Sequence, residues 1–122
     1  MTLADTLEFT ILDHRPLKIN AHWADEILFP YYEGLSIRNL AHTVMRLLDK
    51  TAPRHRIGTA PLDLRLWQPW YEQTKRVVLF ISDGVGWRLL KEAIERDPEI
   101  AQIVADLTGD GHLVPITSVA PS

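Results

Sequence analysis

The sequence predicts an α/β fold with a mainly parallel sheet, and three stretches carry this prediction. Residues 77–81 (Val-Val-Leu-Phe-Ile) are apolar without alternation, which is typical of a strand covered on both faces. Residues 86–107 then show two helical patterns, and residues 113–119 return to a strand-like composition. A strand, two helices and a second strand in this order predict a right-handed crossover between parallel strands.

The N-terminal region predicts a hairpin followed by a short helix. Residues 7–12 alternate as a strand does, residues 13–16 have turn chemistry, and residues 17–20 are the expected partner strand. Residues 21–28 fit a short helix that ends before Pro30, because the residue preceding proline is disfavoured in the helical conformation.

A longer amphipathic helix is predicted over residues 37–49, with Ser36 as its cap. Aliphatic residues recur at three- and four-residue spacing and predict the buried face: Ile37, Leu40, Ala41, Val44, Leu47 and Leu48. The polar residues are expected to face solvent: Arg38, His42, Arg46 and Asp49.

Residues 51–73 form a connector rich in proline, arginine and tryptophan, in which the prolines exclude a long regular element. Residues 62–67 fit one or two helical turns, and the large rings of Trp67, Trp70 and Tyr71 are expected to pack on the domain surface. We expect residues 1–122 to belong to one domain. In this interpretation residues 1–74 are a leader and residues 75–122 are the core.

The two helices after the central strand have clear boundaries. The first is predicted over residues 86–96, and the second begins after Asp97, a good cap that Pro98 follows at the first helical position. The glycines of residues 109–111 end the second helix. Pro115 is compatible with a strand at the edge of a sheet or near the start of the strand.

Composition excludes several classes of protein. The 122 residues carry a formal net charge of -3 with dispersed Lys and Arg, so we expect no nucleic-acid partner. The absence of cysteine excludes disulfide scaffolds and thiolate metal sites, and it is compatible with a reducing compartment. The sequence shows no signal peptide and no apolar run that could span a membrane, so we expect a cytoplasmic protein with no membrane partner.

Asp83 is the first candidate for a functional residue. It directly follows the predicted strand, and in parallel sheets ligands bind outside the carboxyl ends of the strands. The two glycines at positions 84 and 86 are too few for a dinucleotide fingerprint, and here the acid precedes them. Thr117 and Ser118 are weaker candidates, since hydroxyls in a strand usually form structural hydrogen bonds.

With Asp83-Gly84 and the sequence Thr-Ser-Val-Ala-Pro-Ser at residues 117–122, the chain resembles the start of the catalytic domain in the alkaline phosphatase superfamily. The resemblance is to its nucleotide pyrophosphatase/phosphodiesterase branch, although Ala120 stands where an aromatic residue is more usual. Residues 32–40 and 61–63 also look like the leader of bacterial members of the family. The resemblance implies a three-layer α/β/α fold that is incomplete in this chain.

By this resemblance Asp83 corresponds to the first ligand of a two-zinc centre, and Gly84 lets backbone and metal approach closely. The family's nucleophile is a threonine, which would lie one or two positions beyond Ser122 and therefore outside this chain. Gly84 and Ser122 are thus site-supporting residues. The other zinc ligands of the family come from later segments, and none of the histidines present matches one: His14, His22, His42, His55 and His112.

The function that the resemblance implies is hydrolysis of a phosphodiester or a nucleotide pyrophosphate, with a small phosphate ester or nucleotide as substrate. Threonine would attack phosphorus to form a covalent phospho- or nucleotidyl-threonine, which a zinc-bound hydroxide would release. Because only one ligand of the centre is present, we expect this chain alone to be inactive and to hold no zinc.

Two alternative functions stay open. A phosphomutase of the same superfamily also has a strand that ends in Asp-Gly, whereas a sulfatase needs a modification motif that is absent here. In a different class, the chain would be a non-catalytic interaction module that binds through an open sheet edge and the tryptophan-rich connector. An open edge also predicts a homodimer.

Overall fold

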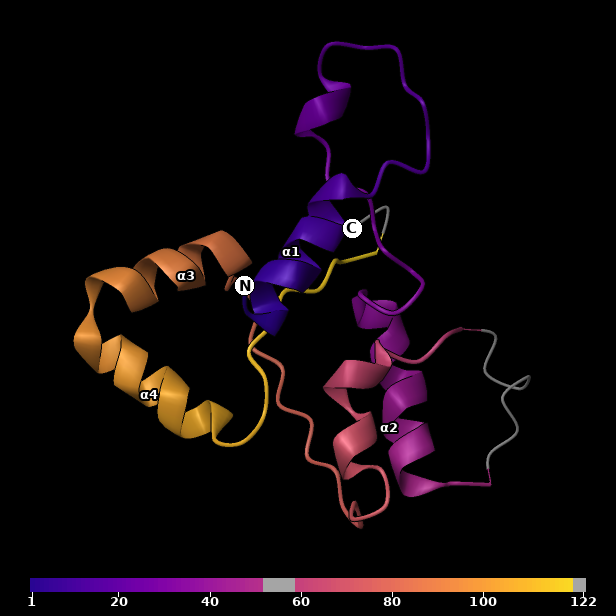
Figure 1. Cartoon of the computed structure of the whole chain (residues 1–122), viewed down its shortest axis with the longest axis vertical. Coiled ribbons are helices and arrows are strands. Elements are labelled where there is room, and N and C mark those ends of the chain that lie inside the picture. The colour runs from indigo at the N-terminus through magenta and orange to yellow at the C-terminus, as the bar shows by residue number, and fades with distance from the viewer. Residues whose placement is uncertain (52–58, 120–122) are drawn as a thin grey trace. The chain divides into compact units, whose positions relative to one another are not determined.

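The computed structural model describes residues 1–51 and 59–119, and the chain divides into two compact units. The first unit is Met1–Val77 with the segment that begins at Val114, and the second is Val78–Leu113. Figure 1 shows the principal helices. The first unit contains α1 (Leu3–Asp13), η1 (Ala24–Glu26), η2 (Ile37–Asn39), α2 (Leu40–Leu48), η4 (Leu64–Leu66) and η5 (Gln68–Trp70), and the second contains α3 (Trp87–Arg96) and α4 (Pro98–Thr108). No helix within the described ranges is long and apolar enough to cross a membrane.

The predicted α/β fold is wrong for the part of the chain that the structure describes. This part contains no sheet, only isolated bridges that pair Tyr31 with Leu35 and Ser36 with Thr117. Residues 77–81 form no strand, and no backbone hydrogen bond joins them to another described residue. Their apolar pattern fits a buried strand only when neighbouring strands supply hydrogen-bond partners, and none does so here. Without a sheet in the described residues, the predicted three-layer architecture and parallel crossover are also wrong. The predicted dimer has no sheet edge in these residues through which to form.

Helix α1 replaces the predicted N-terminal hairpin. Its start is fixed by a capping box, in which the Asp5 amide donates to Thr2 Oγ1 at 3.1 Å and the Thr2 amide donates to Asp5 Oδ2 at 2.8 Å. Leu7 and Ile11 lie one turn apart and are both buried. The alternation over residues 7–12 was therefore a poorer guide than the four-residue spacing of these side chains, which matches a helix.

The core of the first unit is small and apolar. Leu7, Ile11 and Leu35 form its buried centre, and partly buried side chains pack around them: Leu3, Tyr31, Leu66 and Val114. The segment after Val114 therefore belongs to this unit, where Thr117 pairs in parallel with Ser36 instead of with a strand at residues 77–81.

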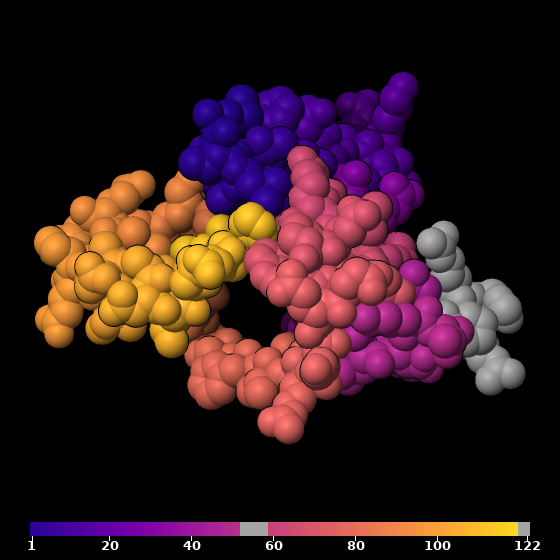
Figure 2. Space-filling model, turned by 60° about the horizontal axis from the view of Figure 1, so that its bottom comes forward, coloured from indigo at the N-terminus to yellow at the C-terminus, as the bar shows by residue number. Residues whose placement is uncertain are grey.

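The predicted helix over residues 37–49 is confirmed as η2 followed by α2, but its buried face differs from the prediction. His42 and Thr43 are buried, whereas Ile37 and Leu48 are about half exposed. The connector lies against this helix: the Leu62 amide donates to Thr43 Oγ1 at 2.7 Å. Figure 2 shows the segment that follows residue 59 in contact with α2. The polar face of the helix is thus buried because it forms hydrogen bonds with the connector.

The connector contains the short helical turns η4 and η5, close to the turns predicted at residues 62–67. Trp67 is buried, its indole N–H donates to the Leu62 carbonyl at 2.8 Å, and its ring meets Tyr71 edge to face. The packing role predicted for Trp67 is confirmed. In contrast, the helix predicted over residues 21–28 is reduced to the single turn η1.

Both helices of the second unit agree with the prediction. Asp97 caps α4 by accepting the Glu99 amide at 2.8 Å, and Pro98 occupies the first turn. Gly109 follows α4 with a φ of 51°, a conformation that glycine adopts without steric cost. Helices α3 and α4 contact each other, but they connect no strands in the described residues.

Candidate functional site

The predicted metal ligand Asp83 lies in an exposed turn of the second unit. Its Oδ1 accepts the Gly84 amide at 2.8 Å, and Gly84 has a φ of 77°. An added Cβ on Gly84 would meet no atom within 4 Å, so the turn needs glycine for its backbone conformation and not for space. The carboxylate is accessible to a ligand from solvent.

The described residues do not assemble a metal centre around Asp83. Nowhere in residues 1–51 and 59–119 do three or more His, Asp or Glu side chains gather in a group that could hold a metal ion. A zinc site needs about three or four protein ligands. Among the described residues, Asp83 is the one that the resemblance assigns to the two-zinc centre, and the other ligands would have to come from elsewhere. The site-supporting prediction for Ser122 lies outside the described residues.

Thr117 and Ser118, the weaker nucleophile candidates, are part of a hydrogen-bonded network. Thr117 is buried, its hydroxyl donates to the Leu35 carbonyl at 2.9 Å, and the same oxygen accepts the Tyr31 amide at 2.8 Å. The Ser36 hydroxyl donates to the Ser118 carbonyl at 3.1 Å. A hydroxyl oxygen that already accepts and donates inside the protein is poorly placed to attack a substrate, so the structural interpretation of Thr117 is favoured.

Asn39 is the centre of this buried polar network. Its Oδ1 accepts the Ser36 amide at 2.9 Å, and its Nδ2 donates to the carbonyls of Tyr32 at 2.7 Å and Ala60 at 2.9 Å. The Gly34 carbonyl accepts the Asp63 amide at 2.9 Å. These bonds join residues 32–40 and 61–63, the two leader segments that carry part of the resemblance described above. They bring the backbone of the two segments together, although 21 residues of chain lie between Asn39 and the start of the second segment.

Asp63 carries the clearest electrostatic perturbation in the described residues. Arg65 approaches it with two nitrogens, Nε on Oδ1 at 2.8 Å and a terminal nitrogen on Oδ2 at 2.9 Å. These hydrogen bonds from Arg65 lower the pKa of the Asp63 carboxyl below its ordinary value of 3.8, and partial burial opposes the shift. The pair closes the turn η4 and is not directed at a cavity.

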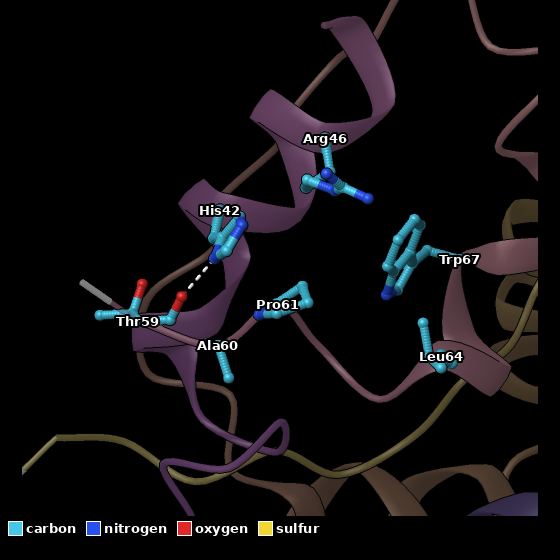
Figure 3. A pocket seen from close by; sticks show the side chains of 7 residues that line it. All are labelled: His42, Arg46, Thr59, Ala60, Pro61, Leu64 and Trp67. Carbon is cyan, nitrogen blue, oxygen red and sulfur yellow. Dashed lines mark hydrogen bonds between the residues drawn. The ribbon is translucent and has the colours of Figure 1, made fainter. Parts of the chain in front are cut away.

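A pocket with functional character lies instead between α2 and the connector, and it is lined by His42, Arg46, Thr59, Ala60, Pro61, Leu64 and Trp67 (Figure 3). Its volume is about 380 Å³. His42 is 3% exposed, and its Nδ1 is hydrogen-bonded to the Thr59 carbonyl. The prediction that His42 and Arg46 face solvent is thus wrong for His42. Their four-residue spacing was the available signal, because it places both side chains on one face of a helix.

Comparison with known proteins adds no relative to this picture. No family model matches the chain, and no match is found among curated proteins or solved structures.

Proposed function

We propose that the chain is the N-terminal part of a zinc-dependent phosphodiesterase or nucleotide pyrophosphatase of the alkaline phosphatase superfamily, in which Asp83 is one metal ligand. The nucleophilic threonine and the other ligands would be supplied from outside these 122 residues. Zinc would polarise the phosphoryl oxygens of a small phosphate ester or nucleotide.

The observation that carries the proposal is the geometry of the Asp83-Gly84 turn. The carboxylate is exposed, a single backbone N–H holds it, and no cation pairs with it in the described ranges. A hard anionic oxygen ligand on an accessible turn suits a divalent cation.

The test compares two forms of the protein in hydrolysis of bis-p-nitrophenyl phosphate with added zinc. We expect no turnover by the 122-residue chain and turnover by a form extended along its natural reading frame. In the extended form Asp83→Ala should abolish turnover, whereas Asp110→Ala, which changes another exposed acid of the second unit, should not. Turnover by the short chain, or an extended form that Asp83→Ala leaves fully active, would refute the proposal.

A second candidate function is a non-catalytic interaction module, and the exposed apolar run at residues 78–81 favours it. Val78 and Phe80 are 93% and 88% exposed. Contiguous exposed apolar side chains often mark a contact with another protein. If the extended form proves inactive and the 122-residue chain self-associates in light scattering through this run, the interaction module is the better description.

A further inference from the structure

His42 is a buried side chain whose hydrogen bonding is only half satisfied. A carbonyl oxygen can only accept a hydrogen bond, so the bond to Thr59 places a proton on His42 Nδ1. The other ring nitrogen, Nε2, is buried and has no hydrogen-bond partner among the described residues. Buried polar atoms nearly always have a partner, and an exception calls for an explanation such as a missing ligand.

Arg46 supplies a positive charge to the same pocket. It lies one helical turn after His42, and in Figure 3 Arg46 extends from α2 toward Trp67, whereas the His42 ring points toward Thr59. No carboxylate in the described residues pairs with Arg46, whose guanidinium lies 5.9 Å from the centre of the Tyr71 ring. None of the seven lining residues is acidic. The polar end of the pocket therefore suits a negatively charged oxygen group.

The remaining wall of the pocket is apolar and flat. Pro61, Leu64 and the Trp67 ring form it, and the Trp67 N–H is already used by the Leu62 carbonyl. Trp67 is largely buried against Tyr71, and the part of its ring that lines the pocket can make apolar contact with a ligand. A volume of about 380 Å³ lies near the lower end of the range for small-molecule sites, which favours a ligand of one or two rings.

We propose that this pocket binds a small aromatic oxyanion. One oxygen of its acid group pairs with Arg46, another forms a hydrogen bond with His42 Nε2, and its ring packs on Trp67, Leu64 and Pro61. With its proton on Nδ1, the neutral ring can only accept at Nε2, so this bond needs a proton on the ligand oxygen. The P–OH of a phosphate monoester supplies that proton, whereas a carboxylate must take one up from solvent as it binds. This site is independent of Asp83 and of the proposed hydrolase.

The test titrates the 122-residue chain with 2-naphthoate, with 2-naphthyl phosphate and, as a neutral probe, with 2-naphthalenemethanol. Tryptophan fluorescence and the ¹⁵N shift of His42 Nε2 report binding. We expect at least one anion to bind and to move the Nε2 resonance, which shows that the acid group reaches this nitrogen. The two anions distinguish a carboxylate ligand from a phosphate ester. No binding by either anion, or equal binding of the neutral probe, would overturn the proposal.

Arg46→Gln should weaken anion binding by about tenfold or more, because the substitution removes a charge-assisted hydrogen bond. Arg38→Gln is the matched control, since Arg38 also lies over a tyrosine ring but does not line the pocket. His42 is monitored in the unsubstituted protein because removing a buried ring can disturb folding. If Arg46→Gln and Arg38→Gln bind the anion equally well, the assignment of Arg46 is wrong.

Discussion

Two regions of the chain invert the usual relation between polarity and burial. The network around Asn39 is polar yet buried, with Ser36 and Asn39 fully inaccessible, whereas the run at residues 78–81 is apolar yet exposed. The difference lies in hydrogen-bond partners. Every polar group of Asn39 meets a complementary group, while the backbone at residues 78–81 meets none in the described residues.

In these two regions, a segment is therefore buried when its backbone N–H and C=O groups find hydrogen-bond partners in the folded protein, and it stays exposed when they do not. Removing an unsatisfied amide from water costs about 1–3 kcal/mol on the scale of protein mutational data, as much as burying a Val or Phe side chain contributes. An extended apolar segment without a neighbouring strand gains little from burial. A polar loop can be buried with a small loss of free energy when another loop supplies hydrogen-bond partners for its polar groups.

Among substitutions of polar residues, the largest effect is expected for Asn39→Ala, which removes three hydrogen bonds at once. The Ser36 amide and two carbonyls would stay buried without partners, so we expect the free energy of unfolding to fall by about 2–3 kcal/mol. Urea denaturation followed by tryptophan fluorescence measures the change as a shift of the midpoint at constant slope.

Asn20→Ala is the control for this substitution, because Asn20 is exposed. It should change the free energy of unfolding by less than about 0.5 kcal/mol. Equal midpoints for Asn39→Ala and Asn20→Ala would show that the network contributes nothing to stability, and the comparison between the two regions would fail.

A smaller effect is expected for Asp63→Asn, and it should depend on pH. The lowered pKa of Asp63 means that its stabilising contribution is present above pH 3.8 and is lost as the pH falls through the lower value in the folded state. Arg65 is about half exposed, so solvent screening limits the loss at neutral pH to about 0.5 kcal/mol. Urea midpoints at neutral pH and at acid pH measure it.

In this experiment the difference between the unsubstituted protein and Asp63→Asn should shrink at acid pH. Asp25→Asn is the control, since Asp25 is exposed in the same unit and forms no ion pair among the described residues. A difference for Asp63→Asn that persists unchanged below the pKa of the folded carboxyl would show that the effect comes from shape and not from charge.

Local signals predicted α2, α3 and α4 correctly, but not α1. The Asp97-Pro98 start and the glycine stop after residue 108 define α4 through contacts within a few residues, and the Ser36 cap does the same for the helix that follows it. At α1 two local patterns compete: the alternation over residues 7–12 predicts a strand, whereas the capping box of Thr2 and Asp5 favours the helix that forms.

The lack of a sheet in the described residues and the presence of the pocket could not be predicted, because both depend on residues far apart in the sequence. Whether residues 77–81 pair as a strand is decided by partners elsewhere, and Thr117 pairs with Ser36 instead. His42 is buried where the carbonyl of Thr59, 17 residues away, accepts a hydrogen bond from its Nδ1. Helix periodicity reports which residues share a face, but it cannot report which face another loop will cover.

The smallest effect is expected for Phe80→Ser in the exposed run. Because the side chain is 88% exposed, its removal should change the free energy of unfolding by less than about 0.5 kcal/mol. The contrasting substitution is Leu35→Ala in the buried core, which should cost about 2–5 kcal/mol. Urea denaturation of both variants makes the comparison direct. A loss of about 2 kcal/mol for Phe80→Ser would show that the ring is covered in solution, and hydrogen-bond partners would then no longer explain the difference between the two regions.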